Sequence, residues 1–208
     1  DGDYVVNLVM DAIARAGLRD ITIAPSSLTN VHAPLVEHCR KGVIRRIYTS
    51  GLRGKLADAI SRGLLDLPVV IHSHGGRARA VEEGSIAVDV AFLGVPSCDR
   101  YGNARGWAGK SACGSLGYAM VDARHARTVV LLSDSIEDYP VGPASIGQDL
   151  VDFPYVQALG LSSYPYFVFD EPAAIPADYY TRLLDDTTLP AFVAEGGWSS
   201  LSVGTTTS

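Results

Sequence analysis

The stretch Val88-Asp89-Val90-Ala91-Phe92-Leu93-Gly94-Val95 is short, rich in β-branched residues and apolar at nearly every position. Such a strand is typical of a parallel sheet that helices cover on both faces. Similar runs occupy residues 21–24, 43–48, 69–71 and 128–132. They alternate with segments of helical spacing at 4–16, 34–40, 52–62, 76–83 and 115–124. This βαβ alternation predicts an α/β fold with an open, mostly parallel sheet and flanking helices.

The character of the chain changes near Asp152. Tyrosine and proline crowd residues 153–180, and residues 201–208 form a Ser/Thr-rich tail that we expect to be disordered or merely terminal. The sequence therefore predicts two parts. An α/β domain covers residues 1–152, and an atypical tail at 153–208 extends or covers the sheet.

The composition narrows the class of function. A chain of 208 residues that is 47% hydrophobic can bury a full core, and a net charge of −6 argues against a general nucleic-acid binder. Its three cysteines form no C-x-x-C pair, so neither a disulfide framework nor a zinc site is indicated. Apolar runs stay below the roughly 20 residues that span a bilayer. The sequence starts Asp1-Gly2-Asp3, without the basic region and apolar region of a signal peptide. We expect a cytoplasmic protein without a metal, a membrane or a nucleic-acid partner.

Small and polar residues follow four of the predicted strands. In open α/β sheets, ligands bind beyond the carboxyl ends of the strands. We therefore expect a ligand site where these segments meet: Pro25-Ser26-Ser27, Thr49-Ser50-Gly51, Ser73-His74-Gly75-Gly76 and Pro96-Ser97-Cys98.

Positive charge accompanies two of these strand ends. Arg77 and Arg79 follow the pair Gly75-Gly76, and a guanidinium at a helix entrance can hold a carboxylate through two hydrogen bonds. Ser50 precedes Arg53 at another helix start, where exposed N–H groups could bind an anion. Ordinary helix capping with solvated cations explains the second segment equally well.

Residues 102–117 are rich in glycine. Gly109-Lys110-Ser111 resembles the end of a phosphate-binding loop, but Ala104 stands where that motif needs its first glycine, so we exclude a nucleotide triphosphatase. The segment could line a long, flexible ligand, with Asn103 and backbone N–H groups as donors to an oxyanion. A plain surface loop is the alternative. The sequence shows no Ser/His/Asp triad and no metal cluster.

Several of these segments together resemble one family. Residues 24–29, 31–35, 47–55, 73–80, 89–98 and 110–122 are closely similar to the citrate lyase alpha subunit, a citrate CoA-transferase. Asp99-Arg100-Tyr101-Gly102, with a later Ser-x-Gly, also resembles the Asp-x-x-Gly loop of other CoA-transferases. The resemblance covers residues 1–152 and implies a CoA-transferase (NagB/RpiA-like) type of fold. Chains of that family carry a second α/β half, which this chain lacks.

The resemblance also implies an activity. Citrate would displace acetyl from the prosthetic-group thioester of an acyl-carrier protein, with CoA as a substitute carrier, by direct exchange through an anhydride. The implied partners are citrate, the citrate lyase beta subunit and the acyl-carrier (gamma) subunit, in an oligomer. We assign catalysis to His74, Gly75, Gly76 and Asn103; substrate binding to Ser50, Arg53, Arg77 and Arg79; and binding of the thioester carrier to Ser26, Ser27, Ser97, Gly102, Gly109, Lys110 and Ser111.

Two other functions stay open at this point. The same strand ends could form a non-catalytic module that binds an acyl carrier, CoA or a carboxylate. Residues 158–167 and 189–198 resemble instead two strands of a retaining TIM-barrel glycosidase, with Glu195 at the nucleophile position. A barrel needs about 200 residues or more, so this combination suggests a chimeric chain in which Glu195 is silent.

Overall fold

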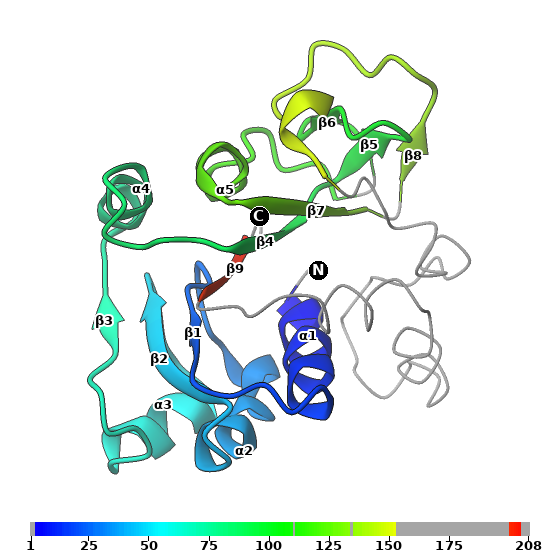
Figure 1. Cartoon of the computed structure of the whole chain (residues 1–208). Helices are drawn as coiled ribbons and strands as arrows, with labels where there is room; N and C mark the ends of the chain where they lie inside the picture. The colour runs from blue at the N-terminus through cyan, green and yellow to red at the C-terminus, as the bar shows by residue number, and fades with distance from the viewer. Residues whose placement is uncertain (1–2, 110, 134, 153–199, 205–208) are drawn as a thin grey trace.

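The computed structural model describes residues 3–109, 111–133, 135–152 and 200–204 (Figure 1). Its α-helices are α1 (Asp3–Arg15), α2 (Leu35–Arg40), α3 (Gly54–Ser61), α4 (His74–Glu82) and α5 (Tyr118–His125), with short 3-10 turns η1 (Asn30–His32) and η2 (Gln148–Leu150). Its strands are β1 (Ile21–Ile23), β2 (Ile44–Thr49), β3 (Val70–Ile71), β4 (Val90–Gly94), β5 (Ser97–Asp99), β6 (Ala104–Arg105), β7 (Thr128–Leu132), β8 (Ile136–Glu137) and β9 (Ser200–Gly204).

The main sheet is parallel throughout and has the strand order β3-β2-β1-β9-β4-β7. From β1 the chain builds outward through β2 to β3, then crosses over and builds the other half from β4 to β7. The order of the strands therefore reverses between β1 and β4. In open α/β sheets, ligands bind at the carboxyl ends of the strands beside such a reversal.

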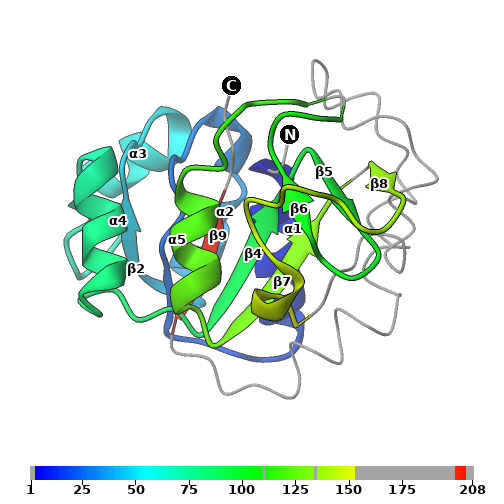
Figure 2. The same ribbon diagram turned by 90° about the horizontal axis from the view of Figure 1, so that it is seen from above.

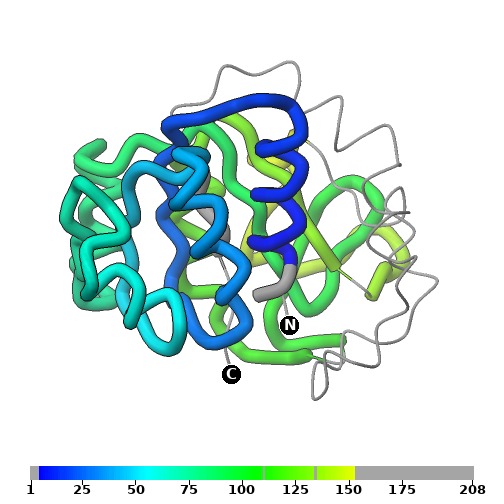
Figure 3. Tube along the Cα trace, turned by 90° about the horizontal axis from the view of Figure 1, so that it is seen from below, coloured from blue at the N-terminus to red at the C-terminus, as the bar shows by residue number. Residues whose placement is uncertain are grey.

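Helices cover both faces of this sheet. Helices α4 and α5 lie on one face, and α1, α2 and α3 lie on the other (Figures 2 and 3). Alternation along the strands separates two cores: Val90 and Phe92 of β4 belong to the core beneath α1 and α2, whereas Ala91 and Leu93 belong to the core beneath α4 and α5. This explains why the strand sequences are apolar on both faces.

A small second sheet lies beyond the carboxyl end of β4. Strand β5 starts three residues after β4 ends, pairs antiparallel with β6 and parallel with β8, and gives the order β6-β5-β8. Cys98 and Ala104 join its inner side to the core beneath α4 and α5. The sequence analysis placed Ser97 and Cys98 after a predicted strand but predicted none of the strands of this second sheet, because they are too short to show a period.

The predicted fold class is confirmed. All five expected strands and all five expected helices are present, with ends shifted by up to three residues. The glycosidase-like segments and Glu195 lie outside the described residues. The expectation of a disordered tail is wrong for Leu201 to Gly204, which form most of β9 and pair with both β1 and β4. None of the described helices has the length and apolar character needed to cross a membrane.

Candidate active site

The loops that follow β1 and β2 are hydrogen-bonded to each other. The Ser50 N–H donates to the Ser26 carbonyl at 2.9 Å, and the Leu28 N–H donates to the Gly51 carbonyl at 2.8 Å. The buried Thr49 hydroxyl lies within hydrogen-bond distance of both accepting carbonyls, at 3.3 and 3.0 Å. Gly51 packs closely here, because a Cβ atom would lie 3.1 Å from the Ser27 hydroxyl. These bonds hold Ser50 at the carboxyl end of β2.

Tyr118, the first residue of α5, joins the separate strand ends. Its hydroxyl lies 3.0 Å from the Ser50 hydroxyl. Its ring stacks on the His74 imidazole with centroids 5.8 Å apart, and the Arg77 guanidinium lies 4.9 Å from the ring centroid. We call Ser50, His74, Arg77 and Tyr118 the Tyr118 cluster. His74 is exposed, whereas Ser50 and Tyr118 are half-buried.

Arg77 anchors the Tyr118 cluster to the interior of the protein. The side chain has no exposed surface and donates two hydrogen bonds to the Asp122 carboxylate, both at 3.0 Å. It also donates to the Ala24 carbonyl from Nε at 3.2 Å and from Nη2 at 2.6 Å. Because these partners occupy the guanidinium inside the protein, the assignment of Arg77 to substrate binding is wrong. Arg77 is a structural cation that ties α4 to α5 and to the end of β1.

The N-terminus of α4 faces the cluster. Ser73 is the N-cap, and its hydroxyl accepts a hydrogen bond from the Gly76 N–H at 3.1 Å. This bond occupies the Gly76 N–H group. The geometry therefore gives no support to the predicted catalytic hydrogen bond from Gly76. The His74 and Gly75 amides belong to the first helical turn, where N–H groups have no intrahelical acceptor. Both residues are exposed.

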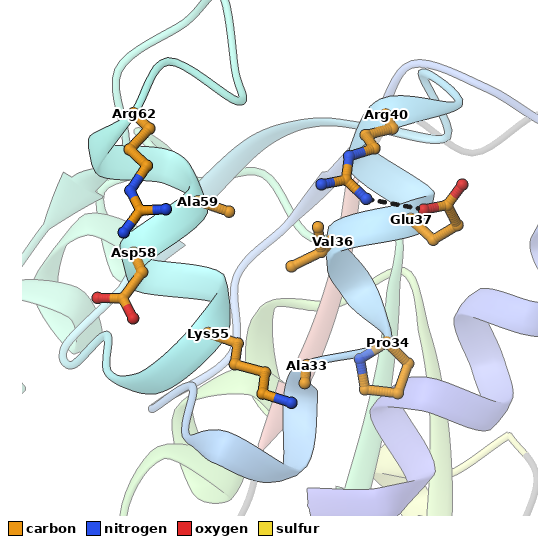
Figure 4. Close-up of a pocket in the computed structure, with 9 residues that line it drawn as sticks. All are labelled: Ala33, Pro34, Val36, Glu37, Arg40, Lys55, Asp58, Ala59 and Arg62. Carbon is orange, nitrogen blue, oxygen red and sulfur yellow. Dashed lines mark hydrogen bonds and ion pairs between the residues drawn. The ribbon is translucent and has the colours of Figure 1, made fainter.

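The other two arginines that the sequence analysis assigned to substrate binding, Arg79 and Arg53, are not members of the Tyr118 cluster. Arg79 is exposed and pairs with Glu83 on its own helix, so it points away from the buried Arg77. Arg53 is exposed and is the N-cap of α3. Beyond it, a groove of about 590 Å³ separates α2 from α3 (Figure 4). Its lining mixes Lys55 and Arg62 with Asp58, so it has no single charge sign.

Asp99 organises the turn in the Asp-x-x-Gly segment. Its fully buried carboxylate accepts hydrogen bonds from the N–H groups of Tyr101 (2.9 Å), Asn103 (3.1 Å) and Val141 (2.9 Å), and from the Asn103 side-chain amide (2.8 Å). Burial raises the pKa of the Asp99 carboxyl, but these donors outweigh it and hold the pKa below its ordinary value. Gly102 closes the turn with φ +97°, a conformation that favours glycine.

This network corrects the assignment of Asn103 as an oxyanion donor. Its amide nitrogen donates to Asp99 and to the Gln148 side chain at 3.1 Å, and its amide oxygen accepts from the Gln148 N–H at 3.1 Å. Gly102 and Ser97 are buried, so neither offers a surface to a carrier molecule in this structure. Their predicted contact with the carrier has no support from the geometry.

The rest of the glycine-rich segment folds back against the end of β4. At Gly109, φ is +87° and a Cβ atom would lie 2.1 Å from the Pro96 carbonyl oxygen. At Gly106, a Cβ atom would lie 2.2 Å from the Gly114 carbonyl oxygen. Gly109 and Ser111 are exposed, and Lys110 lies outside the described residues. The segment leads directly into Tyr118, so it ends at the cluster.

The site therefore offers hydrogen-bond donors at the carboxyl ends of the strands. They are the exposed His74 imidazole, the Ser50 and Tyr118 hydroxyls and the first-turn amides of α4. Burial raises the pKa of the Cys39 and Cys98 thiols to about 12, which makes them poor nucleophiles. Across the described ranges, no group of three or more His, Cys, Asp or Glu side chains could hold a metal ion.

Sequence reasoning missed Tyr118 and Asp122. Tyr118 and Asp122 are four residues apart on α5 and contact the same arginine from one helix face. An aspartate on the apolar side of a short helix is a usable signal, because a buried carboxylate needs a partner. The arginine that provides it, Arg77, lies three and four residues before the buried Ala80 and Val81 of α4, on the same helix face.

Comparison with known proteins places the chain among citrate lyase proteins. The family model "Citrate lyase, alpha subunit (CitF)" matches residues 1–162. The chain is 62% identical over 151 residues to the citrate lyase alpha chain of Escherichia coli (strain K12), a match that covers 73% of this chain and 30% of that protein. It is 58% identical over 160 residues to the alpha chain of Haemophilus influenzae, covering 76% of this chain and 32% of that protein.

A solved structure shows the same similarity. The crystal structure of a citrate lyase alpha subunit from Streptococcus mutans, in complex with citrate, is 46% identical to this chain with a TM-score of 0.68. The match covers 78% of this chain and 38% of that one. This chain thus spans about a third of the length of the relatives that it matches.

Proposed function

The chain belongs to the citrate lyase alpha subunit family, and we propose that it is a citrate CoA-transferase component that exchanges acetyl for citryl on a thioester. The observation that carries the proposal is the 62% identity to a citrate lyase alpha chain over 151 residues. The carrier is the prosthetic group of an acyl-carrier protein, or CoA in its place. The Streptococcus mutans structure contains citrate, which supports citrate as the acyl acceptor.

The exchange needs no covalent intermediate on the protein. A citrate carboxylate oxygen attacks the acetyl carbonyl carbon, an oxyanion forms, and the C–S bond breaks to release the thiolate and an acetyl–citryl anhydride. The thiolate then attacks the citryl carbonyl, and acetate leaves with the electrons of the broken C–O bond. The protein must orient the carboxylate, donate hydrogen bonds to each oxyanion and keep water from the anhydride.

The described residues suggest how these tasks divide. The His74 imidazole stacks on the Tyr118 ring, whose hydroxyl contacts Ser50, and Gly75 follows His74 in the first turn of α4, so we assign these two groups to the carboxylate and the oxyanion. We assign the carrier to Ser27, in the loop bonded to Ser50, and to the exposed Gly109 and Ser111; Ser26 is buried and offers the carrier no surface in this structure. Arg53 and Arg79, both exposed, are assigned to outlying carboxylates or phosphates.

The partners follow from the proposed chemistry. The citryl thioester formed here would pass to the beta subunit for cleavage, and the gamma subunit would carry the acyl group between them. We propose that the chain works in such an oligomer in the cytoplasm. We propose residues 153–208 as an atypical tail of the α/β domain at 1–152; its strand β9 pairs between β1 and β4 rather than at an edge of the sheet.

A second candidate is a binding module without turnover. The chain covers only 30% of the Escherichia coli alpha chain, so a site shared with the remainder of such a protein would be incomplete here. The strand ends would then still bind citrate or a carrier thioester but release no acetate.

The test is citrate-dependent release of acetate from acetyl-CoA or an acetyl-carrier protein, with binding of citrate and CoA measured by calorimetry. His74→Gln should lower the rate by at least tenfold, since removing one donor to the developing charge costs several kcal/mol. The control is His125→Gln, because His125 is exposed at the other end of α5. Binding without acetate release would establish the module instead, and absence of both binding and turnover would refute the proposed function.

A further inference from the structure

We infer that Tyr118 contacts the substrate: its hydroxyl and that of Ser50 form a two-donor clamp for one carboxylate group. The inference rests on the proposed function, because citrate supplies the carboxylate. It adds a residue that neither the sequence motifs nor the family match assigns. The observation behind it is the 3.0 Å separation between the two hydroxyl oxygens at the carboxyl ends of the strands.

The number of protons favours an outside ligand. Each hydroxyl has one proton to donate, and a single hydrogen bond between the two uses only one of them. Within the part of the chain that the structure describes, neither hydroxyl has another hydrogen-bond partner. Both are half-buried, so they keep contact with solvent. A carboxylate has two acceptor oxygens and can take both protons, and hydrogen bonds to a charged acceptor are the stronger kind.

The Tyr118 ring is held in place before any ligand arrives. It contacts two residues of α4: the stacked His74 imidazole, at 5.8 Å, and the Arg77 guanidinium, at 4.9 Å. Arg77 cannot move easily, because Asp122 and the Ala24 carbonyl hold its donors in the interior. The Ser50 backbone is fixed in turn by its bond to Ser26. Such prior ordering lowers the entropy cost of binding.

The charges of the cluster suit an anion. The Asp122 carboxylate is fully buried and its two oxygens accept from Arg77, so it does not face the hydroxyls as an open negative charge. His74 adds an imidazole next to the clamp, and the first turn of α4 adds the positive end of a helix dipole. The clamp is thus placed among groups that favour a carboxylate over a neutral carbonyl.

The test compares Tyr118→Phe, Ser50→Ala and the double variant in the full chain. Phenylalanine keeps the ring and its stacking, so thermal unfolding should stay close to that of the wild type. We expect each single variant to weaken citrate binding by about tenfold or more, the scale for one hydrogen bond to a charged group, and the double variant to weaken it further. The affinity for CoA should change by less than twofold.

Tyr48→Phe is the matched control. Tyr48 lies on β2, stacks on His72 and accepts a hydrogen bond from Arg46. None of these three residues belongs to the Tyr118 cluster. Where turnover is measurable, the Michaelis constant for citrate should rise in Tyr118→Phe while that for acetyl-CoA stays unchanged. A merely structural tyrosine would move both constants or neither.

The outcomes separate this inference from the proposed function. Unchanged citrate affinity in Tyr118→Phe, with normal turnover, overturns the clamp and leaves the transferase standing. Weaker binding of CoA with unchanged binding of citrate also overturns it, because the ligand group would then not be the carboxylate. Citrate binding that depends on both hydroxyls without any acetate release supports the clamp and refutes the transferase. A wild-type chain that binds no citrate refutes both.

Discussion

Replacing Arg77 by leucine should destabilise this protein far more than replacing the other arginine of α4. Arg77 has no exposed surface and donates four hydrogen bonds, two to Asp122 and two to the Ala24 carbonyl. Leucine restores much of the packing but leaves the Asp122 carboxylate buried without its cation. Breaking a buried ion pair in this way costs about 3–5 kcal/mol.

That loss is a large part of the total stability of a domain, which is about 5–15 kcal/mol. The reverse change, Asp122→Leu, should cost a similar amount, because it strands the guanidinium instead. The double variant should cost less than either single change, since no unpaired buried charge remains. It still removes the donors to the Ala24 carbonyl, a loss of about 1–3 kcal/mol.

Urea unfolding followed by tyrosine and tryptophan fluorescence measures these differences. Arg79→Leu is the control, because Arg79 is exposed and its pair with Glu83 on the same helix is worth less than about 1 kcal/mol. The buried pair does not hold α4 and α5 together if the free energy of unfolding of Arg77→Leu lies within about 1 kcal/mol of the wild-type value. The same conclusion follows if the double variant is the least stable of the three variants. The reasoning behind the Tyr118 cluster would then fail as well.

Three further predictions concern the second sheet, the glycine-rich segment and the thiols. Gly109→Ala should unfold at lower urea than Gly114→Ala, because both have positive φ but only the Cβ at 109 meets a backbone oxygen, 2.1 Å away; equal midpoints would contradict this. Asp99 has a lowered pKa in the folded state, so its contribution to stability is complete above the ordinary value of 3.8 and is lost as pH falls through the folded value. The stability of Asp99→Asn should therefore fall less steeply below pH 3.8, and parallel curves would refute the assignment. At pH 8, a thiol reagent should label Cys113 in the native protein, whereas the two buried thiols should react only in urea; rapid native labelling of all three would contradict their raised pKa values.

Local patterns in the sequence predicted the main elements well. The runs at 88–95 and 128–132 contain β4 and β7, because a strand buried on both faces is apolar along its length. The polar residues after each run then indicated the edge where we propose that a ligand binds, since parallel strands place their carboxyl ends together. Short strands such as β6 and β8 have two residues each and show no period, so the second sheet escaped prediction.

The structure brings some of the predicted site residues together and separates others. His74 and Ser50 lie where the sequence indicated, and the structure adds Tyr118 between them. Arg77 and Arg79 looked equivalent after the glycine pair. Two residues on a helix differ by about 200° in direction, so one arginine turned into the core and the other toward solvent. Arg77 shares its helix face with the buried Ala80 and Val81, and its charge is then met by Asp122 of α5 and the Ala24 carbonyl.

The sequence by itself determined the alternation of strands and helices, the edge that we propose for ligand binding and the family, because these depend on local periodicity and on residue identity along one stretch. Tertiary structure alone decided the order β3-β2-β1-β9-β4-β7 and the occupants of the site. Backbone hydrogen bonds between strands do not depend on the identity of the side chains. The insertion of β9 between β1 and β4 could therefore not be deduced from its amino-acid sequence. For the same reason, whether Arg77 or Asn103 meets a substrate or an internal carboxylate depended on partners 45 and 4 residues away, which only the folded chain brings into contact.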